Sequence, residues 1–379
     1  MNNFRLRSYS KAALSLLVVG AMGFLLSTNA WAQTFGPGIF QGIIQSDSNN
    51  DESFGFITVV LSRTGTFSVR FNLGVNGVGQ HVYSKSGKFD ESGHYHFEGP
   101  EPISTRYAVA RIIDLQLDSV SSPTRITGDM TDLTHSSTVE MERVAVATLA
   151  NAAPEAGAYT FLAASGDSGV PHNTGFGRLL VSGLGHLIAV GRSADGRPFS
   201  QAANVTVYDR WPVFAKMAGT TNGILSGWLN FQETAGSDFT GQLTCIGPEV
   251  PGPNHAFVPE FSGNTSVVGS RYIVPVGSPV LNVDSSSNNV HLTLSDGGLE
   301  TSINRNLTLT AGNKFVFSPR LTGDSLVVNP ATGLFAGTFL HSDGRTYPYR
   351  GAILQKQNRG DGEFVDHGGE GGDVSLTPQ

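Results

Sequence analysis

Apolar and polar residues alternate along most of this chain with the two-residue period of a β-strand. In the segment 66–73, every second side chain is large and apolar, and the residues between them are polar. The apolar residues of this segment are Phe67, Val69, Phe71 and Leu73. Because successive side chains of a strand point to opposite faces, the segment predicts a strand with one buried face. The segment 109–118 alternates in the same way and predicts another strand.

Turns that contain glycine join several of these runs. Near the C-terminus, the alternating run 329–341 leads into Asp343-Gly344, and the chain returns through 346–357. Asp-Gly between two alternating runs predicts a tight β-hairpin, because glycine adopts positive φ without steric cost. The same dipeptide occurs at Asp195-Gly196. Repetition of this kind favours neighbouring hairpins that share one core.

The composition indicates the fold class. The chain has 47 glycines, 18 prolines and 23 phenylalanines, and only 15% of its residues are charged. Frequent glycine interrupts helices and serves hairpin turns, and no amphipathic helical pattern follows residue 32. We therefore predict an all-β fold of antiparallel, hairpin-rich units that are barrel-like or sandwich-like.

The N-terminus has the pattern of a cleavable secretory signal. Three basic residues precede an apolar run over 12–26, and Ala30 and Ala32 offer a cleavage site. Residues 1–32 are therefore expected to be removed on export, which predicts a secreted or cell-surface protein. No later stretch is long and apolar enough to cross a membrane as a helix. Removal would change the formal net charge from −7 to −10, which disfavours nucleic acid and anionic membranes as partners.

Breaks in the alternation divide the rest of the chain into two β units in tandem. The first unit is expected at 33–148 and a second, larger unit at 157–365, with a linker of small residues and proline at 149–156. The proline-rich stretch 248–259 is expected to be a long connection inside the second unit. The acidic, glycine-rich tail 366–379 has little to bury and is expected to be disordered.

The C-terminal hairpin resembles a motif of a known group of proteins. The stretches Gly333 to Phe339 and Gly351 to Gly360 look like the closing motif of a poorly characterised group of secreted bacterial all-β domains, and a looser resemblance covers 155–365. In that group, such domains sit at the C-terminal ends of large extracellular proteins that are rich in immunoglobulin-like repeats. The resemblance implies an all-β architecture and an extracellular location, and the group has no established activity. The chain departs from the group's pattern at Cys245, Asp361 and Glu363.

One motif suggests a hydrolase. Residues Gly166 to Pro171 resemble the nucleophile motif of trypsin-like serine peptidases, and His81, Asp114 and Ser168 follow the order of that family's catalytic residues. The residues around His81 do not match the family pattern. The motif also lies in a Gly/Ser-rich loop, where a plain hairpin connection is expected. We predict no catalytic residues and keep the serine hydrolase as a remote alternative.

Two segments have partial metal-binding patterns. His94 and His96 would point to the same face of a strand, but zinc needs three or four ligands and no third ligand occurs at a suitable spacing. The alternating oxygen ligands of 47–51 imitate the first half of a calcium loop, but Glu52 stands where that loop needs glycine. A solvent-facing histidine pair and a solvated loop are the favoured interpretations. No metal and no cofactor is expected.

Three aromatic residues are the candidates for ligand binding. Trp211 and Trp228, with Tyr208 nearby, could form a platform on which a sugar ring stacks. A polysaccharide is therefore one expected partner, and other surface proteins are the alternative. Both tryptophans also lie in alternating strands, where a core position is common. The single cysteine, Cys245, shares a strand face with apolar residues and is predicted to be a buried, unreactive thiol.

Together these patterns favour an exported, non-enzymatic structural and binding module that acts outside the cell or at its surface. A carbohydrate-binding module is the first alternative. An outer-membrane barrel is more remote, because such barrels usually end on an aromatic strand, whereas this chain ends in a polar, glycine-rich tail.

Overall fold

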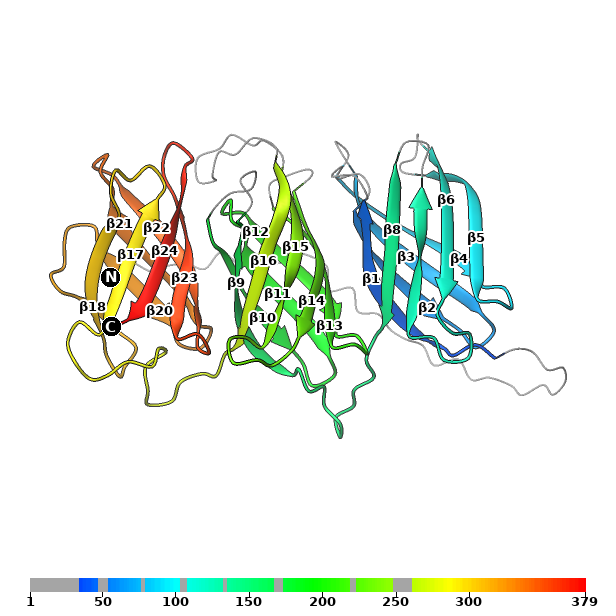
Figure 1. Cartoon of the computed structure of the whole chain (residues 1–379), viewed down its shortest axis with the longest axis horizontal. Coiled ribbons are helices and arrows are strands. Elements are labelled where there is room, and N and C mark those ends of the chain that lie inside the picture. Colours follow the sequence, from blue (N-terminus) through cyan, green and yellow to red (C-terminus); the bar gives the residue numbers. More distant parts are fainter. Residues whose placement is uncertain are drawn as a thin grey trace, which may run out of the picture. The chain divides into compact units, whose positions relative to one another are not determined.

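The computed structural model in Figure 1 describes residues 34–46, 54–75, 79–102, 108–131, 135–166, 173–218, 223–247 and 261–379. All regular secondary structure in these ranges is β-strand, arranged in three antiparallel sheets. The predicted all-β class is therefore confirmed. Residues 33–379 form one compact unit, and the expected signal at 1–32 lies outside the described residues. Within the described ranges, no helix has the length and hydropathy needed to span a membrane.

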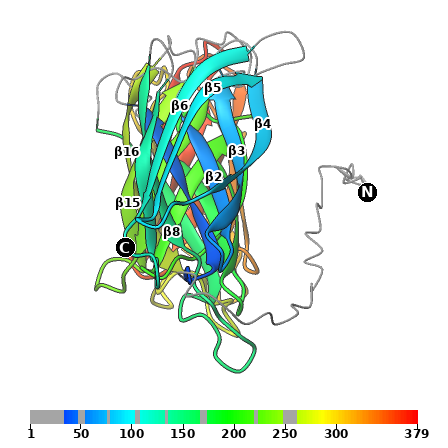
Figure 2. The same cartoon turned by 90° about the vertical axis from the view of Figure 1, so that its right-hand side faces the viewer.

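The first sheet is an up-and-down meander of eight strands. Its strands are β1 (Gly38–Ser46), β2 (Gly55–Leu61), β3 (Thr66–Val75), β4 (Gly79–Lys88), β5 (His94–Pro102), β6 (Ala108–Leu117), β7 (Arg125–Thr131) and β8 (Ser136–Arg143). Strands that are adjacent in sequence pair with each other, and β1 also pairs with β8. The exception is β4 and β5, which do not pair within the described residues. The sheet is therefore barrel-like, and β2, β3 and β4 follow one another around it in Figure 2. Phe67, Val69 and Phe71 lie in its core, as their alternation predicts.

The second sheet repeats this strand order. Its strands are β9 (Gly157–Ala164), β10 (Gly175–Val181), β11 (His186–Arg192), β12 (Pro198–Asn204), β13 (Arg210–Lys216), β14 (Ile224–Phe231), β15 (Phe239–Gly247) and β16 (Phe261–Arg271). β9 pairs with β16, and an isolated bridge from Phe199 to Met217 connects the ends of β12 and β13. The inward side chains form one cluster that fills this sheet.

The third sheet also has eight strands, and again the first pairs with the last. Its strands are β17 (Val290–Asp296), β18 (Ile303–Leu309), β19 (Phe315–Phe317), β20 (Ser325–Asn329), β21 (Leu334–Leu340), β22 (Thr346–Leu354), β23 (Arg359–Val365) and β24 (Gly371–Pro378). An isolated bridge from Lys314 to Val327 connects the segments of β19 and β20. A third cluster of buried side chains fills this sheet.

One turn geometry joins many of these strands. The N–H of its first residue donates to the carbonyl of the fifth, and the N–H of the fourth donates to the carbonyl of the first. The fourth residue has positive φ and is Gly, Asn or Asp. The turn occurs at 62–66, 90–94, 182–186, 193–197, 206–210, 310–314, 341–345 and 366–370. These residue types recur because they adopt the left-handed conformation at the lowest cost, and the predicted turn at Asp343-Gly344 is one of the set.

The number of sheets differs from the predicted two units. The alternation predicts one unit over 157–365, but the structure has two sheets there, β9–β16 and β17–β24. The segment 272–289 connects them and contains no strand. Its apolar residues imitate a strand, but Ile273 and Val276 are 70% and 92% exposed. Val280 and Leu281, later in the segment, are buried in the core of the third sheet without forming a strand. Apolar residues in this segment therefore do not indicate a strand.

The two other predicted breaks fall between strands. The predicted linker 149–156 lies in the connection between β8 of the first sheet and β9 of the second. The proline-rich stretch 248–259 lies outside the described residues. The strands on either side of it, β15 and β16, pair directly with each other, so this stretch connects neighbours in one sheet.

The prediction of a disordered tail at 366–379 is wrong for most of its length. β24 pairs with both β17 and β23 and so closes the third sheet. Val374 and Leu376 are buried in the core of that sheet. The tail carries few apolar residues of its own, but its partner strands supply the apolar surface against which these two side chains pack.

Candidate functional site

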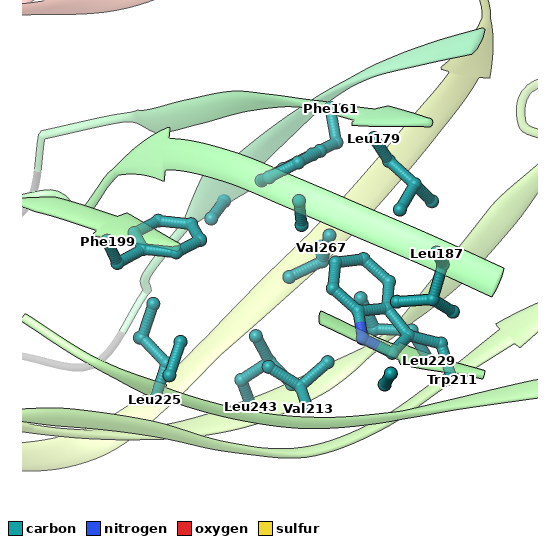
Figure 3. Close-up of a cluster of buried hydrophobic side chains, with 14 of the residues drawn as sticks. Phe161, Leu179, Leu187, Phe199, Trp211, Val213, Leu225, Leu229, Leu243 and Val267 are labelled. Atoms are coloured by element: carbon teal, nitrogen blue, oxygen red, sulfur yellow. The ribbon is translucent and has the colours of Figure 1, made fainter. Parts of the chain in front are cut away.

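The structure places the predicted aromatic binding residues in three different environments. Trp211, on β13, points into the second sheet and is 2% exposed. Figure 3 shows this indole among the buried apolar side chains of that core. Its Nε1 donates a hydrogen bond to Gln201 Oε1 at 3.2 Å. The ring therefore serves the core and is closed to a sugar.

Trp228 occupies an outward position on β14, but residues of the first sheet cover it. It is 9% exposed and packs in a small cluster with Ile43 and Phe54. The guanidinium carbon of Arg210 lies 4.1 Å from the centre of the Trp228 ring. This indole therefore helps to join the first and second sheets.

Tyr208 is the exposed member of the three aromatic residues. It lies in the turn 206–210, and its hydroxyl is 2.7 Å from Thr124 Oγ1. The guanidinium carbon of Arg125 lies 4.3 Å from its ring centre. The structure thus separates Tyr208 from a buried Trp211 and a covered Trp228, so the predicted sugar platform is not formed.

Two sequence motifs fall on residues that the structure does not describe. Ser168 and the segment 47–51 lie outside the described residues, and so does the side chain of His81. Asp114, the remaining member of the hydrolase pattern, lies on β6 of the first sheet. The described residues therefore do not test the remote serine hydrolase alternative or the expectation that 47–51 is a solvated loop.

The histidine pair lies on the outer face of the first sheet. His94 and His96 are neighbours of Asp114, whose Oδ1 lies 3.3 Å from His94 Nε2 and 2.7 Å from His96 Nδ1. All three side chains are substantially exposed. Within the described ranges, no group of three or more His, Cys, Asp or Glu residues could hold a metal ion.

Cys245 is buried, as predicted. It lies in the core of the second sheet. Burial raises the pKa of its thiol, and the negative charge of Asp195 acts in the same direction. The reactive thiolate form is therefore disfavoured at neutral pH.

A buried carboxylate joins the first and second sheets. Glu142, on β8, is fully buried, and its Oε1 lies 2.6 Å from Arg210 Nη1. Its Oε2 accepts a hydrogen bond from Thr206 Oγ1 at 2.6 Å. Arg125 Nη2 is 3.4 Å from Oε1. Because the Glu142 charge is both paired and hydrogen-bonded between the first and second sheets, its role is structural.

The closing motif noted in the sequence helps to join the second and third sheets. In the turn between β22 and β23, Lys356 Nζ lies 2.8 Å from Asp238 Oδ1 and donates to Thr234 O at 2.8 Å. Thr160 Oγ1 donates to Ile353 O at 2.5 Å across 193 positions of sequence. These motif residues hold two sheets together, which gives the motif a structural explanation.

A groove lies between the second and third sheets. Its walls come from β10, β11 and β12 on one side and from β20, β21 and β22 on the other. Its volume is about 490 Å³, within the range of roughly 300–1,000 Å³ that is usual for ligand pockets. The apolar side chains in the lining are Phe176, Val190, Pro198, Val327, Leu334, Phe335 and Ala336. Two arginines complete it, and we name it the Arg192–Arg350 groove.

Strand alternation places both arginines in this groove. On β11, Leu187 and Ala189 are buried inside the second sheet, so Arg192 faces outward. On β22, Tyr349 is buried inside the third sheet, so Arg350 also faces outward. Both arginine residues therefore line the groove, one on each wall.

Part of the groove wall is bare backbone. Gly177 and Gly191 lie opposite each other on β10 and β11 and line the groove. A Cβ at Gly177 would collide with the ring of Phe161, and one at Gly191 would crowd the ring of Phe199. The two glycines thus let aromatic rings of the core pack directly under the sheet, because no side chain stands in the way.

The charges in this groove are not evenly matched. Burial lowers the pKa of Arg192, the positive charge of Arg350 lowers it further, and Glu363 opposes the shift. Glu363 lies opposite Arg350 on β23 and is 3% exposed. Burial raises the pKa of Glu363 despite the attraction of both arginines. Its Oε1 has no hydrogen-bond partner among the described residues, so the two arginines share a carboxylate whose charged form is disfavoured.

Sequence reasoning did not identify this groove. Arg192 and Arg350 belong to strands of different sheets that are far apart in the chain, and no local motif connects them. The available signal is weak: Arg192 ends and Arg350 lies within a strand in which most other residues are apolar or small. Alternation shows that such a side chain faces outward, but not that another sheet lies opposite it.

Comparison with known proteins adds little to this picture. No protein-family model matches the chain, and no curated protein is significantly similar to it. Among solved structures, a double mutant of transferrin binding protein B from Haemophilus parasuis Hp5 is 7% identical, with 91% of this chain and 76% of that chain covered and a TM-score of 0.21. A protein of unknown function from the DUF3598 family of Nostoc punctiforme is 9% identical, with 64% of this chain and 100% of that chain covered and a TM-score of 0.17. Likeness of this degree carries no argument about function.

Proposed function

We propose that this chain is an exported, non-enzymatic binding module that acts outside the cell or at its surface. The Arg192–Arg350 groove is the observation that carries the proposal. It is concave and mainly apolar, and its few polar groups are two arginines and Asn329. This combination is typical of sites that bind small molecules. The ligand is a small molecule with an apolar body.

The interiors of the three sheets are filled with side chains, which favours a binding site on their outer faces. Each of the three sheets surrounds a cluster of buried side chains. A ligand inside a sheet would have to displace packed core residues, and dense packing makes such displacement costly. The groove lies between outer faces and needs no such change.

The chemistry of the lining supports binding rather than catalysis. Ser, Cys, His, Asp and Glu supply most nucleophiles and general bases. None of them lines the groove within the described residues. Arginine remains charged throughout the physiological pH range, and it can hold an anion or accept the polar end of a ligand.

Two parts of the proposal rest on the sequence. Export follows from the signal pattern at 1–32. A polysaccharide ligand has less support than an apolar one, because Trp211 and Trp228 are both buried.

Binding of a neutral apolar dye tests the proposal. We expect the mature chain, residues 33–379, to enhance the fluorescence of N-phenyl-1-naphthylamine in a saturable manner. The Ala336→Trp variant adds a large ring to an exposed position in the groove, so it should abolish the effect. Ala110→Trp makes the same change at an exposed position of β6 in the first sheet and should retain it. Equal binding by both variants, or no saturable binding by the parent chain, would overturn the proposal.

A further inference from the structure

We propose that the ligand of the Arg192–Arg350 groove is a free amphiphilic carboxylate, with one alkyl chain on the apolar walls and its head group between the two arginines. This inference rests on the proposed function, because it specifies the chemistry of a ligand for the same groove. The juxtaposition of two outward-facing arginines on opposite walls carries it.

The geometry of the arginines suits a carboxylate. Arg192 extends from β11 and Arg350 from β22, and both side chains line the groove. Burial and then the positive charge of Arg350 lower the pKa of Arg192, so the two guanidinium charges repel each other. A guanidinium presents its N–H donors in a planar fork that matches the two oxygens of a carboxylate. A carboxylate placed between them would reduce their mutual repulsion.

The acidic residues near the groove leave room for another anion. Asp195 is paired with Arg197, whose Nε lies 2.8 Å from Asp195 Oδ2. Glu363 lies opposite Arg350, and both arginines attract its charge, but burial disfavours its charged form. Glu363, whose charged form is disfavoured, does not balance the two guanidinium charges. A bound anion would complete the charge balance.

The walls of the groove define the other end of the ligand. Val190 and Val327 are 47% and 70% exposed although they belong to a concave apolar surface. An alkyl chain would remove this surface from water, which is favourable in proportion to the area covered. A small inorganic anion could contact the arginines but would leave Val190 and Val327 exposed to solvent. A sugar would find few partners for its hydroxyl groups, because Asn329 is the one neutral polar side chain in the described lining.

Two ligands of equal chain length test the head group. Decanoate and 1-decanol, each below its aggregation limit, would be compared for displacement of N-phenyl-1-naphthylamine from the mature chain. We expect decanoate to bind at least about tenfold more tightly, since charge-assisted hydrogen bonds add to the contribution of the chain. The advantage should shrink at high salt, because screening weakens partly exposed charges.

Arginine variants test the assignment of the two side chains. Arg192→Met and Arg350→Met should lose the preference for decanoate over 1-decanol while they still bind the dye. Arg350→Lys keeps the charge without the fork and should retain part of the preference. Arg345→Met removes an exposed arginine from the turn 341–345 and should behave like the parent chain. Thermal unfolding of each variant shows whether the fold is intact.

The possible outcomes separate the two proposals. Equal affinity for decanoate and 1-decanol would overturn the carboxylate inference and leave the groove as an apolar binding site. Failure of both ligands and of the dye to bind would overturn the proposed function as well. Binding to phosphatidylglycerol vesicles that decanoate does not inhibit would overturn the free carboxylate in favour of a membrane lipid. The comparison of decanoate with 1-decanol uses the parent chain, so it does not depend on whether any variant folds.

Discussion

Strand alternation decides, residue by residue, which side chains a barrel-like sheet buries. Cys245 lies on a face that the sequence predicts to be apolar, and it is buried. Trp228 shows the limit of this reasoning, because it occupies an outward position and is nevertheless 9% exposed under residues of the first sheet. Periodicity gives the direction of a side chain. What covers that side chain depends on residues elsewhere in the sequence.

Trp211→Ala distinguishes a core role from a ligand-binding role. Because the indole is buried in the core of the second sheet, we expect the free energy of unfolding to fall by about 3–5 kcal/mol. Tyr208→Ala, at an exposed position, should cost about 1 kcal/mol or less. Urea unfolding measures both values. Similar small losses in the two variants would show that Trp211 is not part of the core.

Glu363→Gln is expected to increase the free energy of unfolding at neutral pH. Burial raises the pKa of Glu363 above its usual value of 4.5. The folded state therefore holds the proton more tightly than the unfolded state. In the parent chain this stabilisation is complete below pH 4.5 and is lost as the pH rises through the folded-state pKa. The glutamine variant cannot ionise, so it avoids that loss.

Urea unfolding of the Glu363→Gln variant from acid to neutral pH tests whether the substitution raises the free energy of unfolding. The difference from the parent chain should be largest at neutral pH and should disappear in acid, where Glu363 is protonated in both states. Glu370→Gln, at an exposed position, serves as the matched control and should have little effect. A Glu363→Gln variant that is less stable than the parent chain at pH 7 would contradict the account.

At the scale of strands and turns, local pattern predicts most of the elements. The predicted strand 66–73 corresponds to β3 (Thr66–Val75), and 109–118 corresponds to β6 (Ala108–Leu117). β24 was missed because only two of its residues, Val374 and Leu376, carry the apolar alternation. Glycines and acidic residues surround them, and that composition is typical of disorder. The strand forms because β17 and β23 provide partners on both sides.

Leu376→Ala tests whether the tail is part of the third sheet. The side chain is fully buried in that core, so the variant should lose about 2–5 kcal/mol of stability. Ser375→Ala, one position earlier and on the other face of β24, should change stability by about 0.5 kcal/mol or less. Urea unfolding gives both numbers. An unchanged Leu376→Ala variant would mean that the tail does not close the sheet in solution.

The shared turn geometry predicts the effect of a change at Gly344. This residue has φ +82°, and a Cβ there would meet nothing within 4 Å. Gly344→Ala should therefore cost about 1–2 kcal/mol through backbone conformation alone. Gly344→Asn should cost less, because Asn313 holds the same turn position with φ 60° and asparagine tolerates this region. Equal losses in thermal unfolding would show that backbone conformation does not limit this turn.

At the scale of the whole molecule, the arrangement of the sheets depends on contacts that no local pattern reveals. Glu142 with Arg210 and Thr160 with the backbone carbonyl of Ile353 connect different sheets. Glu142, Arg210 and Thr160 look like ordinary surface residues in the sequence. The same is true of Arg192 and Arg350, which acquire a common site only when the second and third sheets meet. The class and most strands were therefore predictable, whereas the third sheet and the candidate site were not.

Protection of an added thiol shows whether a ligand occupies the Arg192–Arg350 groove. Cys245 is buried and its thiolate is disfavoured, so an added surface cysteine would dominate labelling. Val327→Cys places a thiol in the groove wall, and Val276→Cys places one at a more exposed position in the connection 272–289. We expect saturating N-phenyl-1-naphthylamine to slow labelling of the Val327→Cys variant severalfold and to leave the Val276→Cys variant unchanged. Equal labelling of the Val327→Cys variant with and without the dye would contradict the claim.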